Sequence, residues 1–383
     1  MNNSWIEGLT LTDEDKYKYL TPISIETDSE YLVEVKKLFD NIEKDILDFK
    51  APKIYLDVIK NYKMKIIDCI TKYYSGDIVD SYDSITSIIE EFKKNGISIS
   101  TISNSISFNN CDFLIGEEKY HIKDFEFFRA RFTEKATDFL PNEMTHIPFN
   151  ERGKIANQRF SLTGLPCLYL GSTSYCCWEE MKRPSDHNFN VSAIRLKKDF
   201  KILNLTINTP ILLKYLEFFK ISKDSQHKSL LFFKLWIITL VTSFKVKEDN
   251  RLFKSEYIIP QIIMLACKKM NIDGVAYLSK QTKNDEFASR IAVNLALLAK
   301  YNNEDELSSI CNDLQISQSY NYSMYKQLSL PNTYKDYNLH IQTSNTATNI
   351  GSYEMQFEYK QTYFYKFDKF LFAHSKLKDI NIE

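Results

Sequence analysis

Arginine is scarce in this chain, and most of it lies in one short stretch. The 383 residues include 49 Lys and Arg together, of which only eight are Arg. Six of those eight fall within 67 residues: Arg129, Arg131, Arg152, Arg159, Arg183 and Arg195. Three of the nine glycines lie in the same window. A guanidinium binds phosphate oxygens as a fork, and glycine permits close backbone approach, so the window favours a site for a phosphate-bearing ligand over chance clustering.

Common enzyme signatures are missing from the sequence. It contains no GxGxxG, GxxxxGK[ST], HExxH or GxSxG motif, so dinucleotide-dependent hydride transfer, P-loop chemistry and α/β-hydrolase chemistry have no local signature. The seven Cys form no CxxC, and the six His are isolated, which predicts neither a disulfide framework nor a metal site. The formal net charge of −1 argues against nucleic acid as the main partner.

Four segments place polar residues beside apolar runs. They are residues 127–132, 158–166, 168–181 and 272–279. Within them stand the aromatic–Arg pair Phe128-Arg129, then Arg159-Phe160-Ser161 with Gly164 and Pro166, then Tyr169-Leu170-Gly171 with Glu180 eleven residues after Tyr169, and finally Asp273-Gly274 with Tyr277 and Ser279. An Arg at the end of an apolar strand needs a partner, which makes the first segment notable.

This ordered set resembles the RES domain, a family named for Arg, Glu and Ser. The resemblance covers about residues 120–300. Within that range it includes the helix that begins at Tyr257-Ile258 and the closing strand with Asn294-Leu295. The chain departs from the family pattern at three positions: Gln158 stands for Gly, Ser161 for Asn and Gly171 for the usual Ala. The resemblance implies an α+β fold with an ADP-ribosyltransferase-like mixed sheet, and an enzyme that degrades NAD+.

The resemblance also implies roles for individual residues. Cleavage of the nicotinamide–ribose bond passes through an oxocarbenium-like state that a carboxylate stabilises, which makes Glu180 the expected catalytic carboxylate. The alternative for Glu180 is a solvated helix residue like its neighbour Glu179. Arg129 would hold the diphosphate or ribose, and Ser279 would bond one of the same groups. The alternatives for these two are a structural ion pair and a plain strand-end serine.

Four further residues are expected to bind NAD+. Arg159 would hold the diphosphate or ribose, and Tyr169 would stack on nicotinamide or bond its ribose. Phe160 and Ser161 follow Arg159 in the same motif. Structural alternatives exist here too, because Arg159 could form an ion pair and Tyr169 could be a core tyrosine. No cofactor is expected beyond NAD+ as substrate, with inorganic phosphate as a candidate co-substrate.

The acceptor and even the class of function stay open at this point. Water would make the protein an NAD+ glycohydrolase, and phosphate would make it an NAD+ phosphorylase. A protein or nucleic acid acceptor would make it an ADP-ribosyltransferase. A non-enzymatic partner-binding protein with an inactive RES-like domain is the remaining alternative. As an NAD+-consuming enzyme it would act as a toxin or antiphage defence effector, restrained by an antitoxin or regulatory protein or as a homo-oligomer.

Apolar periodicity outlines three parts of the chain. Helices are expected over 29–49, 52–74 and 84–94, within a helical N-terminal module covering residues 1–112. A RES-like catalytic domain would follow at 113–300, with a helical insertion near 210–255, strands at 113–116, 167–171, 274–278 and 293–298, and a helix at 172–181. Residues 301–383 would form an extension packed on that domain. The module resembles HEPN domains, but residues 1–128 contain no Arg, so their Arg-x4-His ribonuclease signature is missing and a regulatory role is expected.

The sequence predicts neither a signal peptide nor a membrane-spanning helix. The N-terminal residues carry no basic segment followed by an apolar run, and the most apolar stretch, 230–244, is 15 residues long and contains Lys234. A membrane-spanning helix needs about 20 apolar residues. We therefore expect a cytoplasmic protein.

Overall fold

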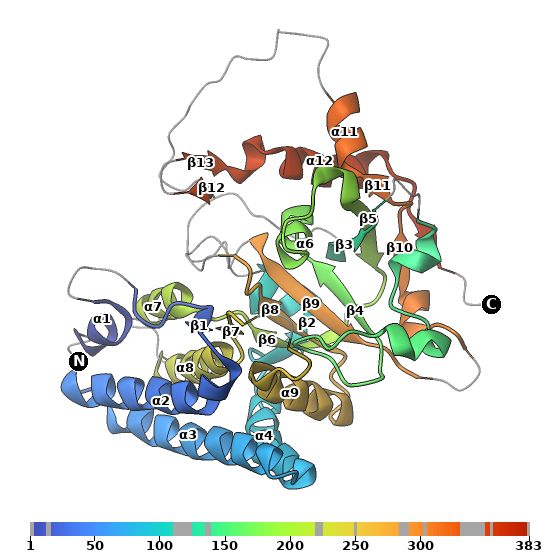
Figure 1. The fold of residues 1–383 in the computed structure, drawn as a ribbon. Coiled ribbons are helices and arrows are strands. Elements are labelled where there is room, and N and C mark those ends of the chain that lie inside the picture. The colour runs from blue at the N-terminus through green and yellow to red at the C-terminus, as the bar shows by residue number, and fades with distance from the viewer. Residues whose placement is uncertain are drawn as a thin grey trace.

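A computed structural model describes residues 4–12, 17–109, 125–134, 139–218, 225–248, 251–282, 291–301, 305–329, 349–352 and 355–380. Within these ranges the chain is a mixture of helices and strands around one large mixed sheet (Figure 1). The α+β class expected from the sequence is therefore confirmed. The strand expected at 113–116 lies outside the described residues.

The large sheet has ten strands. Its order is β14-β10-β5-β3-β4-β9-β8-β6-β2, with β11 also paired to β5. All pairs are antiparallel except the parallel pair of β6 and β8. The strands are β2 (Ile99–Thr101), β3 (Glu126–Phe132), β4 (Cys167–Gly171), β5 (Phe189–Leu196), β6 (Lys201–Leu205), β8 (Gly274–Leu278), β9 (Val293–Leu298), β10 (Leu314–Ile316), β11 (Tyr320–Asn321) and β14 (Lys378–Asp379). Short pairs β1 (Ile23–Ile25) with β7 (Phe244–Val246), and β12 (Asn349–Ser352) with β13 (Met355–Glu358), lie outside it.

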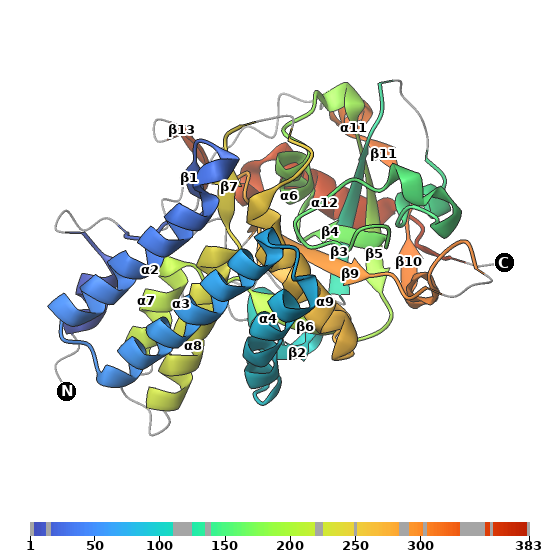
Figure 2. The same ribbon diagram turned by 60° about the horizontal axis from the view of Figure 1, so that its bottom comes forward.

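Seven helices cover one half of one sheet face, below the sheet in Figure 1. They are α1 (Ser4–Thr10), α2 (Tyr31–Asp48), α3 (Lys53–Tyr74), α4 (Ile78–Lys93), α7 (Thr209–Phe218), α8 (Ser225–Val241) and α9 (Ile258–Lys269). Their apolar faces share one core with side chains of β4, β6, β8 and β9. The expected helices at 29–49 and 52–74 are confirmed, whereas the third begins six residues earlier than expected. Helix α3, from the first part of the sequence, packs beside α8 and α9, which follow β6 along the chain (Figures 1 and 2).

A second group of helices covers the β3–β5 half of the same face. It consists of α6 (Ser174–Glu180), α11 (Tyr322–Leu328) and α12 (Tyr363–His374), which pack on Phe128 of β3 and on Phe189, Val191 and Ala193 of β5. The register supports a shared face, because Phe128 pairs with Gly171 and the alternate residue Tyr169 faces the first helical group. The two helical groups therefore lie on the same face, on either side of the β3–β4 boundary.

The opposite face of the sheet has its own core. Leu168, Leu170, Leu295 and Leu297 alternate with the residues of the first face and pack against Met144, Ile310 and Ile380. Short helical turns and α5 (Ile106–Asn109) complete this layer. The strands predicted at 167–171, 274–278 and 293–298 are confirmed, and these mostly apolar runs are buried on both faces of the sheet.

Candidate active site

Strands β3 and β4 are joined by few backbone contacts, which leaves an opening in the sheet between them. These strands pair at a single position, Phe128 with Gly171, while each is fully paired on its other side. Arg129 spans the opening, because its Nη1 donates to the carbonyl oxygen of Tyr169 at 3.1 Å. A cavity of about 170 Å³ lies at this opening. It is lined by Arg129, Ala130, Gln158, Tyr169, Leu170, Gly171, Cys177, Glu180, Met181, Tyr277 and Asn294.

Helix α6 forms one wall of the cavity because it lies unusually close to β4. Thr173 caps the helix, and its side chain accepts a hydrogen bond from the amide of Cys176 at 3.0 Å. A Cβ atom at Gly171 would lie 2.7 Å from the Cys177 sulfur and 3.0 Å from the Thr173 carbonyl oxygen. Glycine at position 171 therefore permits the close approach that brings the last residue of α6, Glu180, to the cavity.

Glu180 is held by a residue from the neighbouring strand. It is exposed, and its Oε1 accepts a hydrogen bond from Nδ2 of Asn294 at 2.6 Å. Asn294 is itself buried, and its Oδ1 faces the Cys176 sulfur at 3.3 Å. Because the thiol donates to that oxygen, the amide nitrogen is left to face the carboxylate. The carboxylate thus has a fixed orientation while it stays open to the cavity.

The adjacent glutamate behaves differently. Glu179 is 2% exposed and accepts a hydrogen bond from Nε of Arg183 at 3.0 Å. The expectation that Glu179 is a solvated carboxylate is wrong, because its side chain points into the protein and pairs with the next turn. Of the two neighbouring glutamates, Glu180 lines the cavity.

Arg129 is a half-buried cation at the cavity. Burial, followed by repulsion from Arg131, lowers the pKa of Arg129 to about 10. The group therefore keeps its charge at neutral pH. Its Nε is buried and has no hydrogen-bond partner among the described residues. Such a cation is costly to bury, and an anionic ligand in the cavity would lower that cost.

Tyr169 also lines the cavity, but its hydroxyl is already hydrogen-bonded within the protein. It lines the cavity from β4, and its hydroxyl donates to the carbonyl oxygen of Phe160 at 2.8 Å. Burial raises the pKa of Tyr169 well above its ordinary value. The neutral ring can offer its face to a ligand, whereas its hydroxyl fixes the loop that precedes β4.

Arg159 lies behind the cavity wall. It is 6% exposed, and its guanidinium carbon stacks 4.3 Å from the ring centre of Tyr277. It donates to the carbonyl oxygens of Leu278 and, at 3.4 Å, of Thr242. Arg159 therefore ties β8 to the end of α8, and it orients Tyr277, which does line the cavity.

The remaining predicted residues are buried near Arg159 and do not line the cavity. Ser279 is 2% exposed, and its hydroxyl accepts a hydrogen bond from the amide of Gln281 at 3.1 Å. The ring of Phe160 lies 4.6 Å from that of Tyr277, and Ser161 donates to the carbonyl oxygen of Gln158 at 2.9 Å. The structure thus brings Glu180, Arg129 and Tyr169 together at the cavity, and places the other four around it.

Sequence reasoning missed three polar residues at the cavity. Gln158 was noted only as a departure from a family pattern, and Tyr277 and Asn294 only as motif matches. A usable signal was present for Asn294, because it is the one amide side chain within the otherwise apolar strand at 293–298. A buried polar residue in such a run requires a partner, and here the partner is Glu180.

Lys280 was also missed. Burial, followed by repulsion from Arg159, lowers its pKa well below the ordinary lysine value. Its Nζ donates to the Phe244 carbonyl oxygen at 2.6 Å and lies 4.7 Å from the ring centre of Tyr257. The Lys280 side chain therefore supports the same wall as Arg159.

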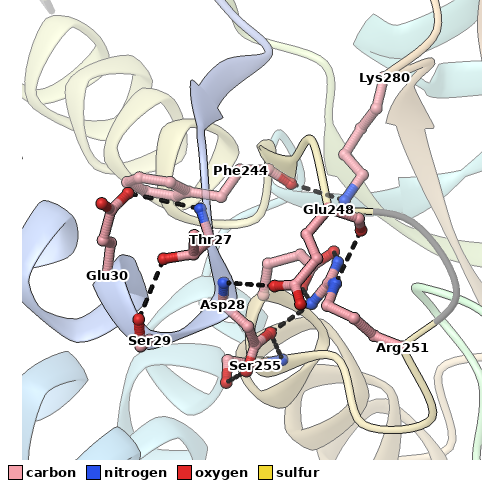
Figure 3. Close-up of polar contacts among 10 residues, drawn as sticks. Thr27, Asp28, Ser29, Glu30, Phe244, Glu248, Arg251, Ser255 and Lys280 are labelled. Carbon is pink, nitrogen blue, oxygen red and sulfur yellow. Dashed lines mark hydrogen bonds and ion pairs between the residues drawn. The ribbon is translucent and has the colours of Figure 1, made fainter.

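A polar cluster joins this wall to the N-terminal segment. Arg251 contacts Asp28 and donates to Glu256 at 2.8 Å, and Ser255 donates to Asp28 at 2.6 Å (Figure 3). Phe244 and Lys280 lie beside this cluster in the same view. The turn that precedes α2 is thus connected through partly buried charges to the loop that precedes α9.

The described residues show neither a metal-binding cluster nor a membrane-spanning helix. No three His, Cys, Asp or Glu side chains gather where they could hold a metal ion. None of the helices within the described ranges has the length and apolar character needed to cross a membrane.

Comparison with known proteins gives a partial match. No protein-family model matches the chain. The "Putative toxin YopC" of Bacillus subtilis (strain 168) is 39% identical over 162 residues, which cover 41% of this chain and 36% of that protein. The chain thus matches little more than a third of the length of this curated relative. A crystal structure of the M. tuberculosis MbcT–MbcA toxin–antitoxin complex aligns with 53% of this chain and 87% of that chain, at 15% identity and a TM-score of 0.27.

Proposed function

We propose that this protein is a toxin that cleaves the nicotinamide–ribose bond of NAD+, acting as an NAD+ phosphorylase or glycohydrolase on an ADP-ribosyltransferase-like fold. One observation carries the proposal. An oriented, accessible carboxylate, Glu180, and a half-buried cation, Arg129, line a single cavity together with the ring of Tyr169. A substrate with a cationic ring, a ribose and a diphosphate requires these groups.

Glu180 would stabilise the positive charge that develops on the ribose. When the bond breaks, its electron pair leaves with the nicotinamide nitrogen, and the ribose carbon becomes oxocarbenium-like. Nicotinamide departs as a neutral base, so no general acid is needed. A single carboxylate, held in place by Asn294, supplies the electrostatic stabilisation.

Arg129 would bind the diphosphate of the same substrate. Its Nη1 is directed at the Tyr169 carbonyl, which leaves the rest of the guanidinium fork for an anion. Arg159 and Ser279 would act from behind the wall, by holding Tyr277 and the loop that follows β8. In this proposal Arg159 and Ser279 support the cavity wall and do not contact NAD+ directly.

The similarity to the Bacillus protein supports the toxin role. NAD+ depletion would harm the cell that makes such an enzyme, so we further propose an antitoxin or regulatory partner. The chain's N-terminal helices, which share a core with α8 and α9, provide a surface on which restraint could act.

The test is incubation of the purified protein with NAD+, with and without inorganic phosphate, followed by mass spectrometry of the products. The proposal expects free nicotinamide in the absence of any macromolecular acceptor. ADP-ribose as co-product indicates water as acceptor, and a phosphorylated ADP-ribose formed only with phosphate indicates phosphorolysis. Nicotinamide release that requires an added protein or nucleic acid would overturn the proposal in favour of a transferase.

A further inference from the structure

The helix that carries Glu180 is anchored by a residue nearly two hundred positions away. Asp368 of α12 is 8% exposed, and its Oδ1 accepts a hydrogen bond from the amide of Ser174, the first residue of α6, at 3.0 Å. Its Oδ2 accepts from the Tyr359 hydroxyl at 2.7 Å. The first turn of a helix has amides without helical partners, so this carboxyl satisfies one that Thr173 does not reach.

Aromatic contacts reinforce the same junction. The ring of Phe364 on α12 lies 5.5 Å from Tyr175 and 5.4 Å from Trp178, both on α6. On the sheet side, Phe372 packs 5.3 Å from Phe128 of β3. Helix α12 therefore contacts both elements that supply the cavity's charged residues, since Arg129 follows Phe128.

We propose that Asp368 is a positioning residue, which fixes the start of α6 so that Glu180 at its end meets Asn294 and the substrate. The inference rests on the proposed function. Helix α6 has only seven residues, so a displacement at Ser174 passes along it to Glu180 with little room for correction. A misplacement of about 1 Å at a catalytic group costs on the order of a hundredfold in rate. In this account the C-terminal segment is part of the active site's framework.

The experiment compares Asp368→Ala with Asp368→Asn, which keeps the shape and an acceptor for the Ser174 amide. Asp379→Asn is the matched control, because Asp379 lies in the same segment but is exposed and pairs with Lys197. Hydrogen exchange of peptides spanning α6 reports the anchor without reference to activity. Nicotinamide release, resolved into kcat and KM, reports the consequence for Glu180.

We expect Asp368→Ala to accelerate exchange in α6 and to lower kcat about tenfold, with KM within about threefold. Asp368→Asn should have an α6 exchange rate and a kcat close to those of the wild type. Asp379→Asn should change neither the exchange rate nor kcat. Unchanged α6 exchange in a folded Asp368→Ala protein would overturn the anchor. Faster α6 exchange with wild-type kcat would overturn its role in positioning Glu180.

A second variant removes the same hydrogen bond from its other side. Ser174→Pro deletes the amide at the first helical position, where proline is tolerated, and the preceding Thr173 already has the extended backbone that proline requires. Its kcat should fall as in Asp368→Ala, and the double variant should lose little more than either. Fully additive losses would contradict the shared contact. If the wild type releases no nicotinamide, the proposed function fails, whereas the exchange measurement still decides the anchor.

Discussion

The side-chain amide of Asn294 donates a hydrogen bond to Glu180 across 2.6 Å, from the central strand β9 to the end of α6. The oxygen of the same side-chain amide accepts a hydrogen bond from the Cys176 thiol. A strand residue buried in the core thus fixes the direction of a carboxylate that is otherwise open to the cavity. The geometry makes Asn294 as important for the orientation of Glu180 as the helix itself.

Asn294→Ala should therefore lower kcat for nicotinamide release by about tenfold, the rate equivalent of one hydrogen bond to a charged group. The carboxylate remains in this variant but loses its orientation, so KM should change little. Asn150→Ala is the control, because Asn150 bonds the exposed Glu306 and neither residue lines the cavity. Equal losses in the two variants would show that Asn294 has no special relation to Glu180.

Arg129→Lys should weaken substrate binding although the charge is kept. Lysine cannot reproduce the guanidinium fork, so kcat/KM should fall by about 10- to 100-fold, mostly through KM. Arg131→Lys provides the comparison, since Arg131 lies two residues further along β3 and is absent from the cavity lining. Steady-state kinetics on both variants decide the matter, and a stronger effect at Arg131 would contradict the assignment.

Gly171→Ala should push α6 away from β4. The added Cβ would meet the Cys177 sulfur at 2.7 Å, and overpacking of this kind costs about 1–3 kcal/mol of unfolding free energy. Gly153→Ala is the control, since nothing lies within 4 Å of a Cβ there. The double variant Gly171→Ala, Cys177→Ala should recover part of the loss in chemical denaturation. No recovery would point to the Thr173 carbonyl as the dominant clash.

Stability should depend on pH through Asp368. Burial raises the pKa of Asp368 from 3.8 to about 7, against hydrogen bonds from Ser174 and Tyr359 and the nearby charge of Lys369. Cys177, Tyr322 and Tyr325 are the other titratable groups that sense this carboxyl. The folded state therefore holds the proton more tightly than the unfolded chain does.

Because the folded state holds the proton more tightly, the free energy of unfolding decreases as pH rises. The stabilisation by the protonated carboxyl is complete below about pH 4 and is lost as pH rises to about 7, at up to roughly 1.4 kcal/mol per pH unit. Asp368→Asn removes this dependence, so its stability relative to wild type should increase from pH 5 to pH 7. Urea unfolding at several pH values measures it. A constant difference across that range would contradict the buried ionisation.

The sequence was sufficient for the elements but not for their partners. Periodic apolar residues placed α2, α3 and the core strands, because these patterns reflect burial directly. The pattern in α2 or α3 does not say what covers it, and the structure packs these helices with α8 and α9 into one core. The late start expected for α4 has a similar cause, since its first turn carries Ile78 and Val79 exposed to solvent.

The candidate site was predictable to a similar degree. Glu180, Arg129 and Tyr169 were identified from ordered motifs, and the structure places them on one cavity. The motifs selected Glu180 by its spacing from Tyr169, but they did not show that the neighbouring Glu179 is buried, because the orientation of the helix depends on Gly171 and Asp368. Nor could they show that Arg159 stacks on Tyr277 behind the wall, since that contact joins segments more than a hundred residues apart.

The central claim is that Glu180 drives cleavage of the nicotinamide–ribose bond, and one comparison tests it most directly. Nicotinamide released from NAD+ is measured for the wild type and for Glu180→Gln, which keeps the size and the partner Asn294 but removes the charge. The account predicts release by the wild type and a loss of at least about a hundredfold in kcat for the variant, with its fold intact. Equal release by the two proteins would contradict the account.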